Sequence, residues 1–472
     1  MANKKFSEFT VKTSTSDVDF VVGYDGTDNV RITPANLTGG GGASSLNGLT
    51  DCLVDTNSLY VGEVPSSLSG NPQGNTILGI DAGNSNTSGT ENTNIGYQAG
   101  YSNATGTNRV CVGYEAGKNG TGNTGVFVGA LAGQGSGTNN GTGSVGIGWG
   151  ALRSYSTGNN NVAIGFQAAR SVGSGVSDCV IIGGTAGYSN SGSSTVLIGK
   201  DAGRNNTATG SSFIGYQAGY SNTSATRNTN IGYEAGYSST TGGSNTNIGY
   251  QSGKNVTGIQ NTFIGDESGV GVSGSSTAFG NIGIGFQALK TITTGGNNVA
   301  IGLTMGSPTA GSQNTLVGVQ TSVGNTFESN ITSIGYQASG NGSSNVITLG
   351  NSSVTTLRCQ ATSITSLSDA RDKKDIKDLE YGLNFIDSLQ PREFVWDNRA
   401  ETDIDGNEYY SNNKGEKDFG FIAQEVKEID NDTLKLVNDT NLEKLELSYG
   451  KLVPILVKAI QELKAEIELL KS

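Results

Sequence analysis

The feature that most constrains this chain is a short motif, an Ile or Val before Gly and then a small Ala-Gly or similar pair, that recurs along residues 76–351. The central glycines of the copies are Gly79, Gly96, Gly113, Gly129, Gly148, Gly165, Gly183, Gly199, Gly215, Gly232, Gly249, Gly265, Gly285, Gly302, Gly318, Gly335 and Gly350. These 17 copies are 15 to 20 residues apart. A period so short has no room for a strand plus a helix, so the repeat predicts a stacked array in which each copy packs on the next.

The composition of one repeat indicates a parallel β-solenoid. We expect two short strands and two turns in each coil, with the branched side chain of x-Ile/Val-Gly pointing inward. The Ala-Gly pair allows a tight turn, and the remaining Asn, Ser, Thr and Gly favour turns rather than packed core. Coils stacked at the strand spacing of about 4.8 Å would give a rod of roughly 80 Å. The regular placement of Ile and Val argues against disorder, which is the alternative for a low-complexity segment.

A single coil buries little, about one or two branched side chains and an alanine, so a face of Ile, Tyr and Phe would stay partly uncovered. Side-by-side association of several chains would bury that face. The repeat resembles the left-handed β-roll of trimeric autotransporter adhesin heads and is similar to Gly-rich repeats of bacteriophage fibres. Both relatives are trimers, so the resemblance implies a mainly β fold, a trimeric parallel β-solenoid or β-roll rod of about 17 coils.

The composition changes abruptly near residue 368. Charged residues make up 39 of the 104 residues after this point but only 31 of the 368 residues before it. Glycine is distributed the other way, with 68 residues before and 5 after. Two different kinds of protein are therefore joined here. The net charge of −12 and the lack of a basic patch predict no binding to nucleic acid.

Several classes of site are disfavoured. The chain has no His, which excludes His-based catalytic triads and His-ligated metal sites. Its cysteines, Cys52, Cys111, Cys179 and Cys359, are far apart, so free thiols are expected and neither metal nor cofactor is predicted. No apolar run reaches 18 residues, so membrane insertion is not expected. The first residues lack the apolar segment of a secretory signal, which predicts synthesis in the bacterial host cytoplasm.

The first 75 residues contain two short strand-rich segments. Residues 9–37 alternate in polarity around an Asp25-Gly26 turn, residues 39–44 read as a flexible linker, and residues 46–72 alternate again. Both segments resemble the opening segments of phage fibre proteins. The resemblance implies a virion-attachment segment at 1–38, followed by a linker and β cap at 39–75. The alternative is a simple β cap that covers the first coil of the array.

The end of the chain reads as a mixed α and β region. Residues 352–368 complete the repeat region, with a last strand expected over 353–366. Next come a helix carrying Leu379, Leu383, Ile386 and Leu389, a strand at PREFVWDN, a turn at Asp405-Gly406, and a strand that leads into a helix. Residues 449–471 then carry apolar side chains at heptad spacing, a pattern that predicts a trimeric coiled coil. The seam residues are Val453, Leu456, Ile460, Leu463, Ile467 and Leu470. The alternative is an ordinary amphipathic helix packed on its own domain.

Four segments of this region resemble a known family. They are SDARDKKDI at 368–376, YGLNFIDSLQPREFVW at 381–396, DFGFIAQEV at 418–426 and LSYGKLVPILVKAIQELKAEI at 447–467. They are similar to the C-terminal intramolecular chaperone, a self-cleaving peptidase domain, of phage tailspikes, fibres and neck appendages. The resemblance covers about 105 residues and implies a small α+β chaperone domain at 369–472. The family pattern is Ser-Asp-x-Arg-x-Lys, and Asp372 stands where Leu is common.

The resemblance also implies a chemistry. Ser368 would be the nucleophile, Lys373 its base and Arg371 a supporting residue, with cleavage at Ser368-Asp369. Two alternatives stay open: cleavage at Leu367-Ser368 by an N→O shift, and Lys374 as the base. The reaction would happen once per chain, so no activity on an external substrate is predicted. Three chains would associate through the tail, and cleavage would then leave a trimer behind a high unfolding barrier.

These features together predict a trimeric phage tail fibre, located in the virion and bound through its N-terminus to a tail or baseplate protein. Its receptor would be a glycan or a protein of the bacterial surface. The alternative is a tailspike depolymerase, which would need two carboxylates about 5–9.5 Å apart. The acids of the repeat region are Asp81, Glu91, Glu115, Asp178, Asp201, Glu234, Asp266, Glu267 and Glu328, and only Asp266-Glu267 is a local pair. A bacterial surface adhesin, the third possibility, would be expected to carry a signal peptide and an anchor.

Overall fold

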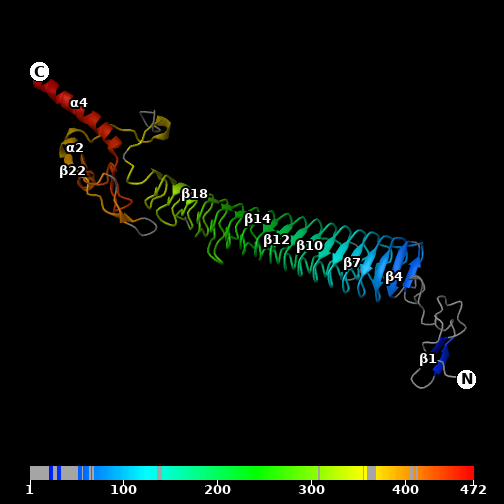
Figure 1. Ribbon diagram of the computed structural model, residues 1–472. Helices are drawn as coiled ribbons and strands as arrows, with labels where there is room; N and C mark the ends of the chain where they lie inside the picture. Colours follow the sequence, from blue (N-terminus) through cyan, green and yellow to red (C-terminus); the bar gives the residue numbers. More distant parts are fainter. Residues whose placement is uncertain are drawn as a thin grey trace. The chain divides into compact units, whose positions relative to one another are not determined.

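The structure is a computed structural model of the 472-residue chain, shown in Figure 1. It describes residues 21–24, 29–32, 52–55, 57–62, 65, 68–135, 141–306, 309–354, 356–358, 368–402, 408–410 and 413–472. The chain forms two compact units, residues 1–223 and residues 224–472. Each unit contains part of the repeat region, and the second unit also contains the C-terminal region.

Each of the 17 repeats forms one β-strand, which confirms the predicted parallel β-solenoid and its mainly β character. In the first unit the strands are β5 (Thr76–Gly79), β6 (Thr93–Ile95), β7 (Val110–Val112), β8 (Val126–Val128), β9 (Val145–Ile147), β10 (Val162–Ile164), β11 (Val180–Ile182), β12 (Val196–Ile198) and β13 (Ser212–Ile214). In the second unit they are β14 (Thr229–Ile231), β15 (Thr246–Ile248), β16 (Thr262–Ile264), β17 (Ile282–Ile284), β18 (Val299–Leu303), β19 (Thr315–Val319), β20 (Thr332–Ile334) and β21 (Ile347–Leu349).

Neighbouring strands within each unit are parallel and in register, so equivalent repeat positions form columns. Val162 lies beside Val180 and Ile164 beside Ile182, for example, and the same pattern continues from turn to turn. Figure 1 shows the strands of the first unit, from β4 to β12, stacked side by side. Backbone hydrogen bonds also join the parts of the turns outside the strands, as between the Gly187 amide and the Ala202 carbonyl at 2.9 Å.

Two antiparallel hairpins precede the repeats. Strand β1 (Val21–Tyr24) pairs with β2 (Asn29–Ile32), which confirms strands on either side of the expected turn; Asp25 and Gly26 themselves lie outside the described residues. Strand β3 (Cys52–Asp55) pairs with β4 (Ser58–Gly62), and β4 also pairs in parallel with β5. The second hairpin therefore hydrogen-bonds to the first repeat strand, as expected of a β cap.

Two expectations for the single repeat were wrong. The described turns contain one three- to five-residue strand each, not two. In most strands the middle residue is buried, as Ile181 and Leu197 are, whereas the Ile or Val before the glycine points outward and is partly exposed. The reason is the alternation of side chains along a strand: when the middle of three residues faces inward, the two flanking residues face outward.

The outward strand positions, together with the residue after each central glycine, give each unit an apolar face. In the first unit it includes Tyr97, Tyr114, Ile147, Trp149 and Phe166, which are 37% to 57% exposed. Equivalent aromatic rings stack from turn to turn, with ring centroids 5.5 Å apart for Tyr97 and Tyr114 and 5.2 Å apart for Trp149 and Phe166. The partly uncovered face of Ile, Tyr and Phe that the sequence predicts is therefore present.

The central glycine of each repeat is required by the close stacking of the turns. Gly183 has a φ of +136°, a backbone conformation that L side chains rarely adopt. A Cβ atom at this position would lie 2.5 Å from the carbonyl oxygen of Gly199 in the next turn. The neighbouring Gly184 meets neither restriction, because a Cβ atom there would find nothing within 4 Å.

These two adjacent glycines provide a matched test of the stacking. We expect Gly183→Ala to lower the free energy of unfolding by at least about 1–3 kcal/mol, because the new methyl group overlaps the next turn. Gly184→Ala should change it by less than about 0.5–1 kcal/mol in either direction. Urea denaturation followed by circular dichroism measures both. Equal losses in the two variants would contradict the stacking geometry.

The interior contains columns of asparagine, which corrects the expectation that these residues form only turns. The residue before each strand from β15 to β20 donates its backbone N–H to the side-chain oxygen of the asparagine one turn earlier, at 2.8–3.0 Å. The asparagines of this column are Asn228, Asn245, Asn261, Asn281, Asn298 and Asn314. Each side-chain amide also donates to a turn carbonyl, so these buried polar groups have partners in the neighbouring turns.

A second column, in the first unit, contains Asn190, Asn206 and Asn222. The Asn206 amide donates to the Asn190 side-chain oxygen at 2.7 Å and to the Ala208 carbonyl at 2.9 Å. Its own side-chain oxygen accepts from the Asn222 amide at 2.9 Å. Asn206 is fully buried, whereas the adjacent Asn205 is exposed.

The contrast between Asn206 and Asn205 makes a second prediction. Asn206→Ala should lower the free energy of unfolding by about 1–3 kcal/mol, because buried partners in two neighbouring turns lose their hydrogen bonds. Asn205→Ala should change the free energy of unfolding by less than about 0.5 kcal/mol. The same urea measurement applies, and a loss at Asn205 as large as that at Asn206 would show that the buried column is not the cause.

The cysteines that the structure describes with their side chains are Cys111 and Cys179, and both are buried free thiols. Burial raises the pKa of the Cys111 thiol, since a buried thiolate is poorly solvated. The side chain of Cys52 and all of Cys359 lie outside the described residues. The two buried thiols fit the expected free cysteines of the repeat region.

The C-terminal region is a small α+β fold, which confirms the predicted fold class. Strands β22 (Arg392–Val395) and β25 (Lys417–Gly420) form an antiparallel pair, as do β23 (Glu401–Thr402) with β24 (Glu408–Tyr409) and β26 (Val437–Asn438) with β27 (Glu446–Leu447). The helices are η4 (Ala370–Asp372), α2 (Leu383–Ser388), α3 (Ala423–Asp430), η5 (Tyr449–Lys451) and α4 (Leu452–Lys471). Their apolar core includes Phe385, Leu389, Val426, Leu436 and Ile455.

Some expectations fall partly outside the described residues. Those residues of 353–366 that the structure describes form no strand, and the remainder is not described. The Asp405-Gly406 turn is not described either, although β23 and β24 lie on its two sides. No helix in the described part of the chain is both long and apolar enough to span a membrane. Its Cys, Asp and Glu side chains also form no cluster of three that could hold a metal ion.

Candidate functional site

The first residues of the C-terminal region form a single tight turn. Helix η4 places the Asp372 amide 3.2 Å from the Asp369 carbonyl and the Lys373 amide 3.2 Å from the Ala370 carbonyl. Lys373 is extended, with φ −123° and ψ 142°, so the turn ends there. This one turn reverses the chain direction and brings the side chain of Lys373 back toward Ser368.

The structure brings together the two residues that the sequence resemblance assigns to catalysis. The Nζ atom of Lys373 lies 2.6 Å from the Oγ atom of Ser368 and 3.5 Å from the Ser368 carbonyl oxygen. In contrast, Lys374 has no hydrogen-bond or ion-pair partner among the described residues. The amine and hydroxyl are therefore in the contact that a base and its nucleophile require.

Asp369 and Arg371 hold the turn in this conformation. An Asp369 carboxylate oxygen accepts the Arg371 backbone N–H at 2.9 Å, which caps η4. The Arg371 side chain also donates to both carboxylate oxygens, from Nε at 3.0 and 3.1 Å and from Nη2 at 2.6 Å. These bonds lower the pKa of Asp369 and raise that of Arg371, because each stabilises the charged form of the other.

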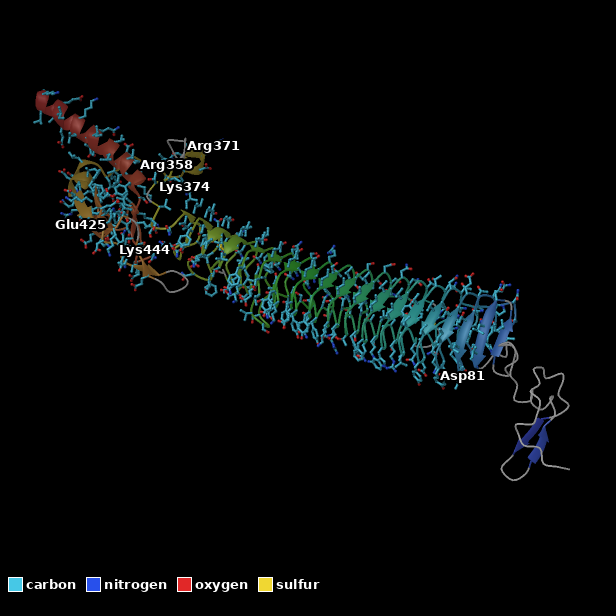
Figure 2. All side chains as sticks on the ribbon, viewed as in Figure 1. Asp81, Arg358, Arg371, Lys374, Glu425 and Lys444 are labelled. Atoms are coloured by element: carbon cyan, nitrogen blue, oxygen red, sulfur yellow. The ribbon has the colours of Figure 1, made fainter. Side chains whose placement is uncertain are left out.

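The capping role of Asp369 was missed in the sequence, where this residue stands only as one side of the expected cleavage site. The signal was available, since an aspartate directly before a turn is a preferred N-cap, and an arginine two residues later can reach its carboxylate. Figure 2 shows Arg371 on the same short segment as Lys374. The bond Ser368-Asp369 lies within this segment, whereas Leu367 is outside the described residues.

The four residues Ser368, Asp369, Arg371 and Lys373 are all exposed to solvent in the single chain. Only a neutral lysine amine accepts a hydroxyl proton. Burial disfavours the charged form of a lysine. The arrangement therefore has the geometry of a Ser-Lys dyad but not, in one chain alone, the environment that would activate it.

The seam residues of the C-terminal helix are exposed as well. Leu452, Ile455 and Ala459 of α4 are buried against the core of the C-terminal region. The predicted seam, Val453, Leu456, Ile460, Leu463, Ile467 and Leu470, is 42% to 86% exposed. One side of α4 thus packs on its own domain, and a second apolar side at heptad spacing has no partner within the described chain.

Several acidic residues of the repeat region pair with bases and amides. Glu115 bonds to Lys118 at 2.8 Å, Asp201 to Arg204 at 2.7 Å and Glu234 to Lys254 at 2.6 Å. Glu267, half of the one local acidic pair, bonds to Lys290 at 2.7 Å, and this contact together with the Gln287 amide lowers its pKa. A glycosidase acid needs a raised pKa, so the depolymerase alternative gains no support here.

Residues 368–435 match the family model described as chaperone of endosialidase. The match begins at Ser368 and includes the contact between Ser368 and Lys373, the ion pair between Asp369 and Arg371, and helices α2 and α3. It ends before helix α4, so the resemblance noted in the sequence at 447–467 lies beyond the matched residues. No curated protein matches the chain.

Proposed function

We propose that this chain is the subunit of a homotrimeric phage tail fibre whose C-terminal region assembles the trimer and then cuts itself off. The β-solenoid and the chaperone-of-endosialidase match fit a protein of the phage tail fibre or tailspike type. The observation that carries the self-cleavage is the 2.6 Å contact between Lys373 and Ser368, at the first residue of the matched segment. The divisions proposed above, with a virion-attachment segment at 1–38 and a released domain at 369–472, belong to the same proposal.

The apolar faces support assembly into a trimer. The outward strand residues of the solenoid form an apolar column within each unit, pairs of stacked aromatic rings lie beside it, and such surfaces mark interaction sites. The seam of α4 adds three heptads of exposed Leu, Ile and Val. Three copies that associate through α4 would hold their apolar solenoid faces close together while the turns of each solenoid stack.

Assembly would also activate the dyad. When the exposed turn is covered by neighbouring chains, the neutral form of Lys373 is favoured, and its amine takes the proton of the Ser368 hydroxyl. The oxygen then attacks a peptide carbonyl carbon, the C–N bond breaks, and Lys373 returns the proton to the departing amine. Water finally hydrolyses the ester, so the step is balanced and occurs once per chain.

The bond that breaks depends on which carbonyl is attacked. Attack on the preceding carbonyl, an N→O shift within one chain, breaks Leu367-Ser368. Attack by Ser368 on its own carbonyl would close a strained four-membered ring, so cleavage at Ser368-Asp369 calls for the hydroxyl of a second copy. We favour Ser368-Asp369, and the first residue of the released fragment distinguishes the two: Asp369 for this bond, Ser368 for the other.

The cleavage makes a third prediction. The full chain of 48.4 kDa should lose about 105 C-terminal residues and run on a gel as an SDS-resistant trimer, whereas Ser368→Ala and Lys373→Ala should keep the full mass. Lys374→Ala, the matched control, should cleave like the parent protein. Intact mass spectrometry with gel mobility is the measurement. A parent chain that keeps its full mass, or a Lys373→Ala chain that is cut, would contradict the proposal.

The seam of α4 makes a fourth prediction, tested in the uncleaved Ser368→Ala background. Leu463→Asp should abolish the trimer, because it places a charge in the apolar seam, whereas Lys464→Asp on the neighbouring position should leave it intact. Sedimentation velocity gives the molecular mass of both. If Leu463→Asp still sediments as a trimer, α4 is an ordinary amphipathic helix of its own domain.

The fibre would be located in the virion, with its N-terminus on a tail or baseplate protein and its shaft directed to a glycan or protein of the bacterial surface. The ion pairs of Glu115, Asp201, Glu234 and Glu267 favour binding of that receptor over hydrolysis. Adsorption of the cleaved trimer to host cells, measured with fluorescently labelled protein, tests this part of the proposal.

A further inference from the structure

The residues five positions after each central glycine form a column along the repeats, and in part of the first unit this column is rich in arginine. From the turn of β9 to the turn of β12 it holds Arg153, Arg170, Tyr188 and Arg204, which we call the arginine–tyrosine column. The side chains are partly exposed. The column is separated from the apolar strand face by a buried alanine and a left-handed residue in each corner, as at Ala186 and Gly187 or Ala168 and Ala169.

The column is rigidly ordered. Consecutive turns are joined beside it by backbone hydrogen bonds, from the Ser154 amide to the Arg170 carbonyl at 2.8 Å and from the Ser171 amide to the Tyr188 carbonyl at 2.8 Å. The ring of Tyr188 lies between two guanidinium groups, with the Arg170 carbon 5.3 Å and the Arg204 carbon 5.0 Å from its centroid. Arg170 also donates to the Tyr188 hydroxyl. Cation–π contacts of this kind hold the guanidinium groups in place before any ligand arrives.

Within the described part of the chain, only one of the three arginines of this column is neutralised by a carboxylate. Lys118, Lys254 and Lys290 each bond to a carboxylate, and Arg204 bonds to Asp201. In contrast, Arg153 and Arg170 form no ion pair among the described residues, and Arg153 instead donates to the Gln134 side chain at 3.1 Å. The Nε atom of Arg170 is buried without a hydrogen-bond partner. Two guanidinium groups in successive turns therefore keep donors that match an anion.

We infer that the arginine–tyrosine column is a receptor site that binds an anionic sugar polymer, through a carboxylate or phosphate group held between Arg153 and Arg170. This rests on the proposed function, in which the shaft meets the bacterial surface. The turns repeat at about 4.8 Å, close to the length of one sugar ring, so a chain lying along the shaft presents successive rings to successive turns. The residues that follow the column, Ser154, Ser171 and Ser189, supply hydroxyl groups beside it.

A sparsely charged glycan fits this surface better than a nucleic acid. The two free guanidinium groups lie in a chain with a net charge of −12, and Glu115 and Asp201 are in nearby turns. A polyanion with a charge on every unit would meet these carboxylates. An acidic polysaccharide with neutral rings between its charges avoids them.

The test uses the assembled protein and three defined polymers: hyaluronate, which has a carboxylate on every second ring, phosphomannan for phosphate, and dextran as the neutral polymer. At least one anionic polymer should bind and dextran should not. Arg153→Gln/Arg170→Gln should raise the dissociation constant at least about tenfold, because charged hydrogen bonds are lost. Lys118→Gln/Lys254→Gln, which removes the same charge from paired lysines, should change it less than about twofold. The comparison of carboxylate with phosphate identifies the anion.

Three results would overturn the inference: equal binding of dextran, equal weakening in both double variants, or no binding of any of the polymers. Because the column lies within one chain, these results count whatever the oligomeric state. A cleaved trimer that adsorbs to host cells but binds no polymer would leave the proposed function intact. A protein that neither trimerises nor cleaves, yet binds hyaluronate through Arg153 and Arg170, would contradict the proposed function alone.

Discussion

The hydrogen bond between one turn and the next is the interaction on which the rest of this structure depends. Each amide of the short strands, and many outside them, bonds to a carbonyl of the adjacent turn. Turns this close leave no space for a side chain at the central glycine, which is why Gly183 and its equivalents recur through the chain. The same closeness places identical positions in columns, so one residue type, repeated, produces a ladder of asparagine, a stack of aromatic rings or a row of acids.

The columns explain which parts of the fold the sequence predicted and which it did not. The period and the recurring glycines predicted 17 stacked coils, and each repeat is present as one strand rather than the expected two. The direction of the side chains was wrong, because a three-residue strand has only one inward position and the sequence does not say which it is. The buried asparagines were taken for turn residues. Their partners, such as the Asn206 partners Asn190 and Asn222, are a full turn away in the sequence, so no local pattern reveals them.

The candidate site also depends on contacts that its sequence pattern does not reveal. The family resemblance pointed to Ser368 and Lys373, and the structure places their side chains in contact. The spacing alone would not have done so, since the contact depends on the turn that Asp369 and Arg371 hold closed. Solvent exposure of the pair is a property of the single chain that no sequence pattern contains. This exposure connects cleavage to assembly, because neighbouring chains that cover the turn would favour a neutral Lys373.

The central claim is that assembly through α4 comes before cleavage at Ser368. The most direct test is the mass of the Leu463→Asp chain with Ser368 intact, measured over time beside the parent protein. The account predicts that this chain stays monomeric and keeps its full mass, while the parent loses its C-terminal fragment. A monomeric Leu463→Asp chain that releases the fragment at the parental rate would contradict it, since the dyad would then act without a trimer.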